Sequence, residues 1–280
     1  MTPTDTPAAA APVEPDALAP RRSLPPAVRG MRAAFAFASR LPVGGFPYAE
    51  RDWHWAAAHL PLVGIVVGGL CAATFWLAGW LGLGQELAAA LALLASVALT
   101  GAFHEDGLAD SADGLGGAHG GKSALEIMKD SRIGTYGAVA LGLSLLIRFA
   151  AIGELARAGW FALIYVHCAA RVGPVWLLAS EPHLAAEGAK VRSLLSTERR
   201  HVVVAIAWGL ACAAVGVGSG LASWRVALAV PLALALATAL CARYFRRTVG
   251  GINGDLLGAT EQVCEIVGWI ALLSASTSAA

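Results

Sequence analysis

Residues 60–83 read LPLVGIVVGGLCAATFWLAGWLGL, without a single charged side chain. At about 1.5 Å per residue, a helix of this length is longer than the roughly 30 Å hydrocarbon core of a bilayer. Six further stretches have similar length and apolar content, at 86–103, 136–156, 159–179, 202–222, 226–242 and 263–279. The predicted fold class is therefore all-α, a polytopic integral membrane helical bundle with about seven transmembrane helices.

The composition of the whole chain agrees with lipid as the solvent. Hydrophobic residues make up 57% of the sequence and charged residues 14%, against roughly 45–50% and about 25% in soluble domains. The net charge is only +1, so the chain has no overall basic field and we expect no nucleic-acid partner. The five cysteines form no CxxC pair and are interpreted as small core residues of the apolar stretches.

The N-terminal part differs from the rest of the chain. Residues 1–28 are rich in Ala and Pro and are predicted to be a disordered tail, because they cannot bury enough surface to offset chain entropy. The stretch 31–45 is too short to cross a bilayer and predicts an interfacial or re-entrant helix. The chain thus divides into this tail and a membrane-embedded domain over residues 29–280.

The distribution of Lys and Arg predicts the topology. If the N-terminus is cytoplasmic, sixteen of the 20 basic residues fall on that side, and only Arg157 and Arg225 fall on the other. Arg148 and Arg171 lie inside apolar segments. Cytoplasmic loops carry the basic excess in membrane proteins, so we expect the C-terminus on the far side. The three long polar loops would all be cytoplasmic, at 104–135, 180–201 and 243–262.

The densest polar stretch is HEDGLADSADGLGG, at residues 104–117. Asp106, Asp110 and Asp113 are spaced i, i+4 and i+7, so on a helix continuing from the preceding segment they share one face. Clustered carboxylates repel one another unless a cation neutralises them, and hard oxygen ligands suit Mg²⁺ bound together with substrate phosphates. The three aspartates are therefore the predicted metal ligands, with a solvated acidic loop as the alternative. Glu105 lies off this face and is expected to be dispensable for activity.

Two further polar stretches carry candidate anion-binding groups. Lys129 and Arg132 precede the third apolar segment, where they could clamp phosphates or only anchor the chain at the membrane surface. The stretch 243–262 repeats the combination of Gly, Asp and Arg, so we expect it to meet the acidic stretch and complete one site. The predicted substrate-binding groups of these stretches are Lys129, Asp130, Arg132, Arg246, Asn253, Asp255 and Glu261.

Three ionisable residues lie deep within apolar segments. Arg148, His167 and Arg171 are costly in lipid unless they face the bundle interior and find partners there. His167 and Arg171 are four residues apart and share a helix face. The two arginines are further candidates for substrate binding, whereas His167 is interpreted as a packed, hydrogen-bonded histidine.

Three stretches taken together resemble cobalamin synthase, a family also called adenosylcobinamide-GDP ribazoletransferase. They are HEDGLADSADGLGG at 104–117, IMKDSRIGTYG at 127–137 and GGINGDLLGATEQ at 250–262. The resemblance extends from about Arg32 to the C-terminus. It leaves the Ala- and Pro-rich tail without a counterpart.

The resemblance implies an Mg²⁺-dependent enzyme of the bacterial inner membrane. Such an enzyme joins adenosylcobinamide-GDP to α-ribazole, or to α-ribazole 5′-phosphate, and releases GMP. The family pattern His-x-Asp-Gly-x-x-Asp-x-x-Asp-Gly falls on His104, Asp106, Asp110 and Asp113, which become the candidate catalytic residues. His104 or a free carboxylate would accept the hydroxyl proton. Asn253 stands where the family pattern has Thr.

Two other functions compete with this interpretation. A CDP-alcohol phosphotransferase also uses clustered aspartates and Mg²⁺, but its motif continues through an Ala-Arg pair, and here no Arg follows Gly107 before Arg132. A transporter would carry its acidic residues at the membrane midplane, whereas here they cluster near one surface. A homo-oligomer is left open.

Overall fold

The computed structural model describes residues 24–45, 48–118, 123–154, 159–184 and 197–277. Within these ranges the regular structure is helical, with one isolated bridge between His183 and Ile252. The predicted all-α fold is confirmed. The helices are α1 (Pro26–Ala38), α2 (Glu50–Ala58), α3 (Leu60–Trp80), α4 (Gln85–Thr100), α5 (Phe103–Gly117), α6 (Ala124–Met128), α7 (Thr135–Gly153), α9 (Phe161–Ala170), α10 (Val172–Ser180), α12 (Arg199–Gly218), α13 (Trp224–Thr248) and α14 (Gly254–Thr277).

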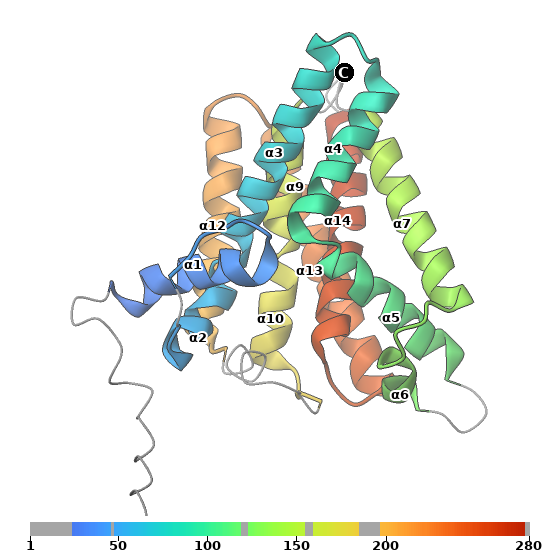
Figure 1. The fold of residues 1–280 in the computed structure, drawn as a ribbon. Helices are drawn as coiled ribbons and strands as arrows, with labels where there is room; N and C mark the ends of the chain where they lie inside the picture. Colours follow the sequence, from blue (N-terminus) through green and yellow to red (C-terminus); the bar gives the residue numbers. More distant parts are fainter. Residues whose placement is uncertain (1–23, 46–47, 119–122, 155–158, 185–196, 278–280) are drawn as a thin grey trace, which may run out of the picture.

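Six segments among the described residues are long and apolar enough to cross a membrane, namely α3, α7, α9 with α10, α12, α13 and α14. The pair α4 and α5 passes the same test only together and is bent by 87°, which raises the number to seven if the pair forms one broken span. Successive segments run in alternating directions, so the C-terminus lies at the opposite end of the bundle from α1, α2 and α6 (Figure 1). The predicted polytopic membrane bundle is confirmed.

A sharp bend separates α4 from α5. Gly101 and Ala102 both adopt left-handed backbone, with φ of 71° and 60°, and the Ala102 N–H donates to the Val97 carbonyl at 2.9 Å. Left-handed residues end helices in this way because they turn the chain out of the helical path. The acidic stretch is helical as expected, but the expectation that it continues the preceding segment is wrong.

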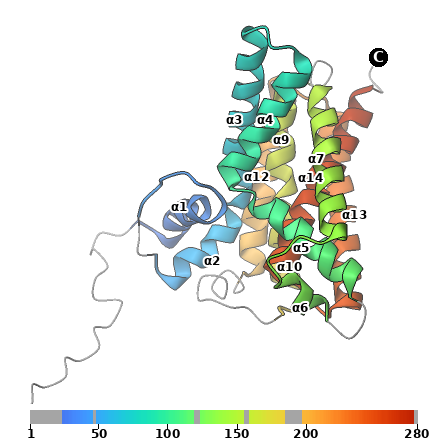
Figure 2. The same ribbon diagram turned by 45° about the vertical axis from the view of Figure 1, so that its right-hand side comes forward.

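The N-terminal region contains two helices beside the lower end of α3 and α12 (Figure 1, Figure 2). The first begins at Pro26, so the predicted disordered tail at 1–28 extends too far. Residues 1–23 of the predicted tail lie outside the described residues. The second helix, at 50–58, is not expected from the sequence. An ion pair joins the two helices, with Arg29 Nε 2.8 Å from Asp52 Oδ2.

The loop expected at 243–262 is much shorter in the structure. Helix α13 continues to Thr248 and α14 already begins at Gly254, so only residues 249–253 connect them. Asn253 fixes this start, because its Oδ1 accepts the Leu256 N–H at 2.9 Å, as N-terminal capping residues do. Of the other expected loop at 180–201, residues 185–196 lie outside the described residues.

Helix α9 lies at the centre of the bundle. All but one of its ten residues are buried, and α3 packs against it through two glycines four positions apart. A Cβ on Gly64 would overlap the His167 carbonyl, and a Cβ on Gly68 would overlap the Leu163 carbonyl. Small residues at this spacing let membrane helices approach each other closely.

We predict that this contact distinguishes two adjacent glycines. Gly68→Ala should destabilise the protein by about 1–3 kcal/mol, because the added methyl forces α3 away from α9. Gly69→Ala is the matched control, since a Cβ there meets nothing within 4 Å. Thermal unfolding in detergent would measure both. Equal melting temperatures for the two variants would contradict the close approach of α3 and α9.

Candidate functional site

The aspartates of α5 differ in their environments. Asp106 is exposed, Asp110 is half-buried and Asp113 is buried. Asp110 interacts electrostatically with Asp106, Asp113 and also Asp255 on α14. Four carboxylates from two helices therefore lie close enough to repel one another.

Backbone contact between α5 and α14 brings these carboxylates together. A Cβ on Gly107 would lie 2.8 Å from the Asp255 carbonyl oxygen and 3.1 Å from the Gly258 Cα. The Asn253 amide donates to Asp255 Oδ2 at 3.0 Å and so orients that carboxylate in the first turn of α14. The expected meeting of the acidic stretch with the stretch before the last helix is confirmed.

Asp113 contacts the start of α7, which its spacing from Asp106 and Asp110 in the sequence does not predict. Its two carboxylate oxygens accept the backbone N–H groups of Gly134, at 2.6 Å, and Gly137, at 2.8 Å, at the start of α7. A carboxylate at a helix N-terminus satisfies donors that have no partner within the helix and interacts favourably with the helix dipole. Asp113 thus ties α5 to α7.

The structure does not assemble the predicted three-aspartate metal site. Among the residues it describes, no group of three or more His, Cys, Asp or Glu side chains is arranged to hold a metal ion. The engagement of Asp113 by α7 accounts for this, because Asp106 and Asp110 are left as a pair on α5. Metal binding itself stays a prediction, and a site completed by substrate phosphates needs only one or two carboxylates.

The segment between α6 and α7 carries the predicted clamp residues. Lys129 follows α6 directly and is exposed. Arg132 is exposed and makes a bidentate contact with Asp130, through Nε at 3.0 Å and Nη2 at 2.6 Å. This hydrogen bond and the charge of Asp130 raise the pKa of Arg132 above its usual value. The three residues lie just before α7, whose start Asp113 holds against α5.

Arg246 forms an ion pair with Glu181. Its Nε and Nη2 donate to the two carboxylate oxygens of Glu181 at 2.9 and 2.6 Å, and Glu181 is buried directly after α10. The bidentate pair joins the ends of α10 and α13. The predicted role of Arg246 in substrate binding is therefore not supported by a contact with the acidic residues of α5.

Six ionisable side chains form a buried charge network inside the bundle. Arg148 Nη2 donates to Glu105 at 3.0 Å and Nη1 donates to Glu265 at 2.9 Å. Arg171 Nη1 lies 2.9 Å from Glu261 and 3.5 Å from Glu265. Every member is at most 4% exposed. The buried charge network consists of Glu105, Arg148, His167, Arg171, Glu261 and Glu265.

The buried charge network bears on two predictions, that the buried ionisable residues find partners and that some of them bind substrate. The expectation that Arg148, His167 and Arg171 face the interior and find partners is confirmed, with His167 in contact with Glu265. Arg171 pairs with Glu261, and Arg148 pairs with Glu105 and Glu265. The predicted role of Arg148, Arg171 and Glu261 in substrate binding stays a prediction. The sequence analysis does not identify Glu265, although Glu261 and Glu265 stand four residues apart in an otherwise apolar segment, which is a detectable signal.

His104 faces the same interior. It is buried, and its Nδ1 lies 3.7 Å from Glu261 Oε2. Asp106, two positions further on, is exposed because residues i and i+2 point to different sides of a helix. This placement favours a free carboxylate over His104 as the acceptor of a substrate proton.

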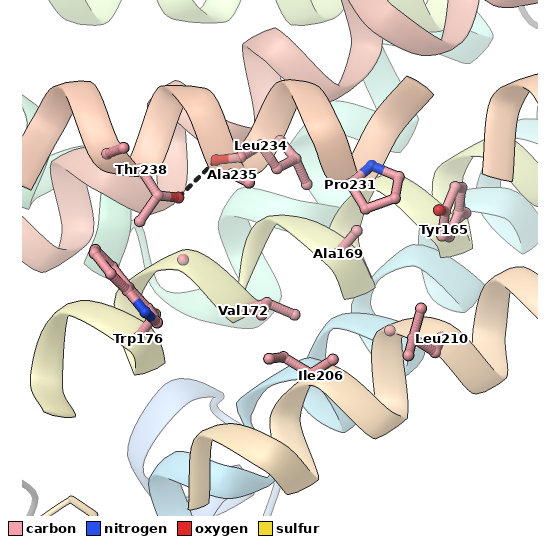
Figure 3. A pocket seen from close by; sticks show the side chains of 13 residues that line it. Tyr165, Ala169, Val172, Trp176, Ile206, Leu210, Pro231, Leu234, Ala235 and Thr238 are labelled. Carbon is pink, nitrogen blue, oxygen red and sulfur yellow. Dashed lines mark hydrogen bonds between the residues drawn. The ribbon is translucent and has the colours of Figure 1, made fainter. Parts of the chain in front are cut away.

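An apolar groove of about 450 Å³ lies between α9–α10, α12 and α13 (Figure 3). Its lining includes Tyr165, Trp176, Leu210 and Leu234, and among the described residues no charged side chain contributes to it. Thr238 Oγ1 already donates to the Leu234 carbonyl at 2.7 Å. Because α5 contributes nothing to this lining, the groove is separate from the acidic site.

The amino-acid sequence of this chain is similar to those of one known protein family. The family model of cobalamin-5-phosphate synthase matches residues 30–273. An adenosylcobinamide-GDP ribazoletransferase of Leptothrix cholodnii is 41% identical over 251 residues, which cover 85% of this chain and 93% of the relative. Its counterpart in Bradyrhizobium diazoefficiens is 40% identical over 244 residues, covering 86% and 91%. No solved structure matches the chain.

The capping role of Asp113 predicts a loss of stability on substitution. Asp113→Ala should destabilise the protein by about 1–3 kcal/mol, since the buried Gly137 N–H and the half-buried Gly134 N–H lose their acceptor. Asp113→Asn should cost less, because the amide oxygen still accepts one of them. Thermal unfolding in detergent is the measurement, with exposed Asp106→Asn as the control. A melting temperature for Asp113→Ala equal to that of the control would argue against the cap.

Proposed function

This chain belongs to the cobalamin-5-phosphate synthase family, and we propose that it catalyses the adenosylcobinamide-GDP ribazoletransferase reaction. The family match over residues 30–273 and the relatives that bear this name support the proposal. In the reaction, a hydroxyl of α-ribazole, or of α-ribazole 5′-phosphate, attacks the phosphorus that carries the cobinamide. The bond between the two phosphates breaks and GMP leaves. The product is adenosylcobalamin or its 5′-phosphate.

The contact of Gly107 with α14 is the observation that carries the site assignment. It places Asp106 and Asp110 on α5 beside Asp255 on α14. Transfer of a phosphoryl group depends on holding the reactants in line and on neutralising charge on the phosphoryl oxygens. Two rigid helices in backbone contact are suited to the first task.

The described side chains do not form a group of three that is arranged to hold a metal ion. The proposed Mg²⁺ ligands are therefore one or two of the carboxylates Asp106, Asp110 and Asp255. They supply only carboxylate oxygens, and they are partly open to solvent, which suits a cation that keeps several waters and takes its remaining ligands from substrate phosphates. Bound there, Mg²⁺ would neutralise negative charge on the diphosphate. Asp113 is left out because α7 occupies both of its oxygens.

The chain's own groups would perform the remaining steps. A carboxylate of this cluster accepts the proton of the attacking hydroxyl. Lys129 and Arg132 bind the diphosphate, and Arg132 exchanges Asp130 for a phosphate oxygen. That exchange costs little, because water and salt screen an exposed ion pair and leave it contributing little to stability.

We further propose that the protein lies in the bacterial inner membrane with the acidic site facing the cytoplasm. Helices α1 and α2 and the C-terminal end of α13 lie at the same end of the bundle as α6 and carry six arginines, whereas Arg225 lies at the end that holds the C-terminus (Figure 1). The positive-inside rule then assigns the basic end to the cytoplasm. The nucleotide-linked substrate would reach the site from that side.

The proposed reaction predicts how substitutions of Asp106 and Asp110 behave. Purified protein should release GMP from adenosylcobinamide-GDP only when α-ribazole or its 5′-phosphate is present. Asp106→Asn and Asp110→Asn should each lower turnover by about 100-fold, as loss of one charge-stabilising group does. Because both act on one cation, the double variant should cost little more than the worse single variant, and added Mg²⁺ should partly rescue the singles.

Two variants serve as controls for this experiment. Glu86→Gln removes an exposed carboxylate at the far end of α4 and should leave turnover unchanged. Asp113→Asn should lower stability but keep the wild-type dependence on Mg²⁺. Wild-type Mg²⁺ dependence in Asp106→Asn and Asp110→Asn would remove these residues from the metal site. Release of CMP from a CDP-alcohol would point to the competing phosphotransferase.

The proposed orientation can be tested with single cysteines at the two ends. Ser131 precedes α7 and Ser219 follows α12, and both are exposed, whereas the native cysteines are buried or half-buried. A membrane-impermeant maleimide should label Ser219→Cys in intact spheroplasts, and Ser131→Cys only after permeabilisation. The reverse pattern would invert the orientation.

A further inference from the structure

The buried charge network connects four helices that are far apart in sequence. Glu105 comes from α5, Arg148 from α7, His167 from α9, and Glu265 from α14. Three carboxylates in the network face two guanidiniums, and His167 lies against Glu265. Charges this deep in a membrane protein mark function more often than stability.

Arg148 has a special position in this network. Its two Nη groups reach carboxylates on different helices, Glu105 on α5 and Glu265 on α14. These are the two helices that carry Asp106 and Asp255. Glu105 directly precedes Asp106, so one side of α5 is held by Arg148 while the next residue is presented at the surface.

The network is not arranged for maximal stability. Glu105 Oε2, Arg148 Nε and Arg171 Nε are buried and have no hydrogen-bond partner in the described part of the protein. Buried ion pairs of this kind are often no more stabilising than apolar side chains of equal volume, and unsatisfied buried groups call for another explanation. Fixing the relative position of helices provides one.

We propose that Arg148 and Glu105 are positioning residues that hold α5 against α14, so that Asp106 and Asp110 face Asp255 at the distance the reaction requires. This inference rests on the proposed transferase function. Neither side chain touches the substrate, because both are buried behind the acidic face. They act by fixing the rotation of α5, which Gly107 alone leaves free.

The test compares Glu105→Gln and Glu105→Leu with a matched control. Asp52→Asn also alters a buried carboxylate in an ion pair with an arginine, Arg29, but on α2 and away from α5. Two quantities are measured for each variant in detergent. The first is hydrogen–deuterium exchange of residues 103–117, and the second is kcat and KM for GMP release per folded protein.

We expect Glu105→Leu to accelerate exchange in α5 about tenfold, because this helix loses its anchor. Its kcat should fall about 100-fold, as small misplacements of reacting groups do, with KM within about threefold of wild type. Glu105→Gln should lower kcat about tenfold, because its amide oxygen still accepts from Arg148 but carries no charge. The contact of Glu105 with Arg148 thus replaces the expectation from the sequence that Glu105 is dispensable. Asp52→Asn should change exchange only in residues 26–58 and leave kcat unchanged.

Several results would overturn the proposal. Wild-type kcat and wild-type α5 exchange in Glu105→Gln would do so, and this variant decides the matter if Glu105→Leu does not fold. Faster exchange spread evenly over α3, α9 and α14 would indicate a general loss of stability instead of a local anchor. If wild-type protein releases no GMP, the proposed function fails, whereas the exchange measurement still decides whether Glu105 anchors α5.

Discussion

The Arg148 guanidinium ties α5, α7 and α14 together through Glu105 and Glu265. Inside a bilayer a charged side chain has no bulk water to interact with, so its counter-charge must come from a neighbouring helix. Because one guanidinium engages two carboxylates, α5 and α14 cannot shift independently along α7. The exposed position of Asp106 beside Asp255 follows from this constraint.

Glycines and charges make different contributions to the bundle. Gly64 and Gly68 let α3 approach α9, and Gly107 and Gly258 let α5 approach α14. Such contacts set the distance between helices in lipid. There the hydrophobic effect contributes little to helix association, because lipid tails are as apolar as the side chains. They do not select one rotation about the helix axis. The charged pairs do so, because only one rotation brings a carboxylate to its guanidinium.

Hydropathy alone predicts most of the spans and their alternating directions, because lipid imposes a minimum apolar length on each helix. It also predicts that Arg148 must find partners inside the bundle. It does not predict which partners. From the sequence, Glu105 belongs to a polar loop and Glu265 to an apolar span, and their pairing with Arg148 depends on the 87° bend after α4. Likewise α2 is only nine residues long and begins with three charged side chains, so hydropathy does not identify it as a helix.

Asp113 shows why spacing alone could not identify the side chains that we propose as metal ligands. It shares a helix face with Asp106 and Asp110, and the difference between them arises only where α7 begins. At that point two N–H groups without helical partners donate hydrogen bonds to the Asp113 carboxylate. These bonds stabilise its negative charge, so Asp113 does not need a cation. The same contact holds the start of α7 against the C-terminal half of α5, and Arg132 lies two residues before Gly134. One aspartate is thus removed from the proposed metal site, while the segment proposed to bind phosphate lies beside the end of α5.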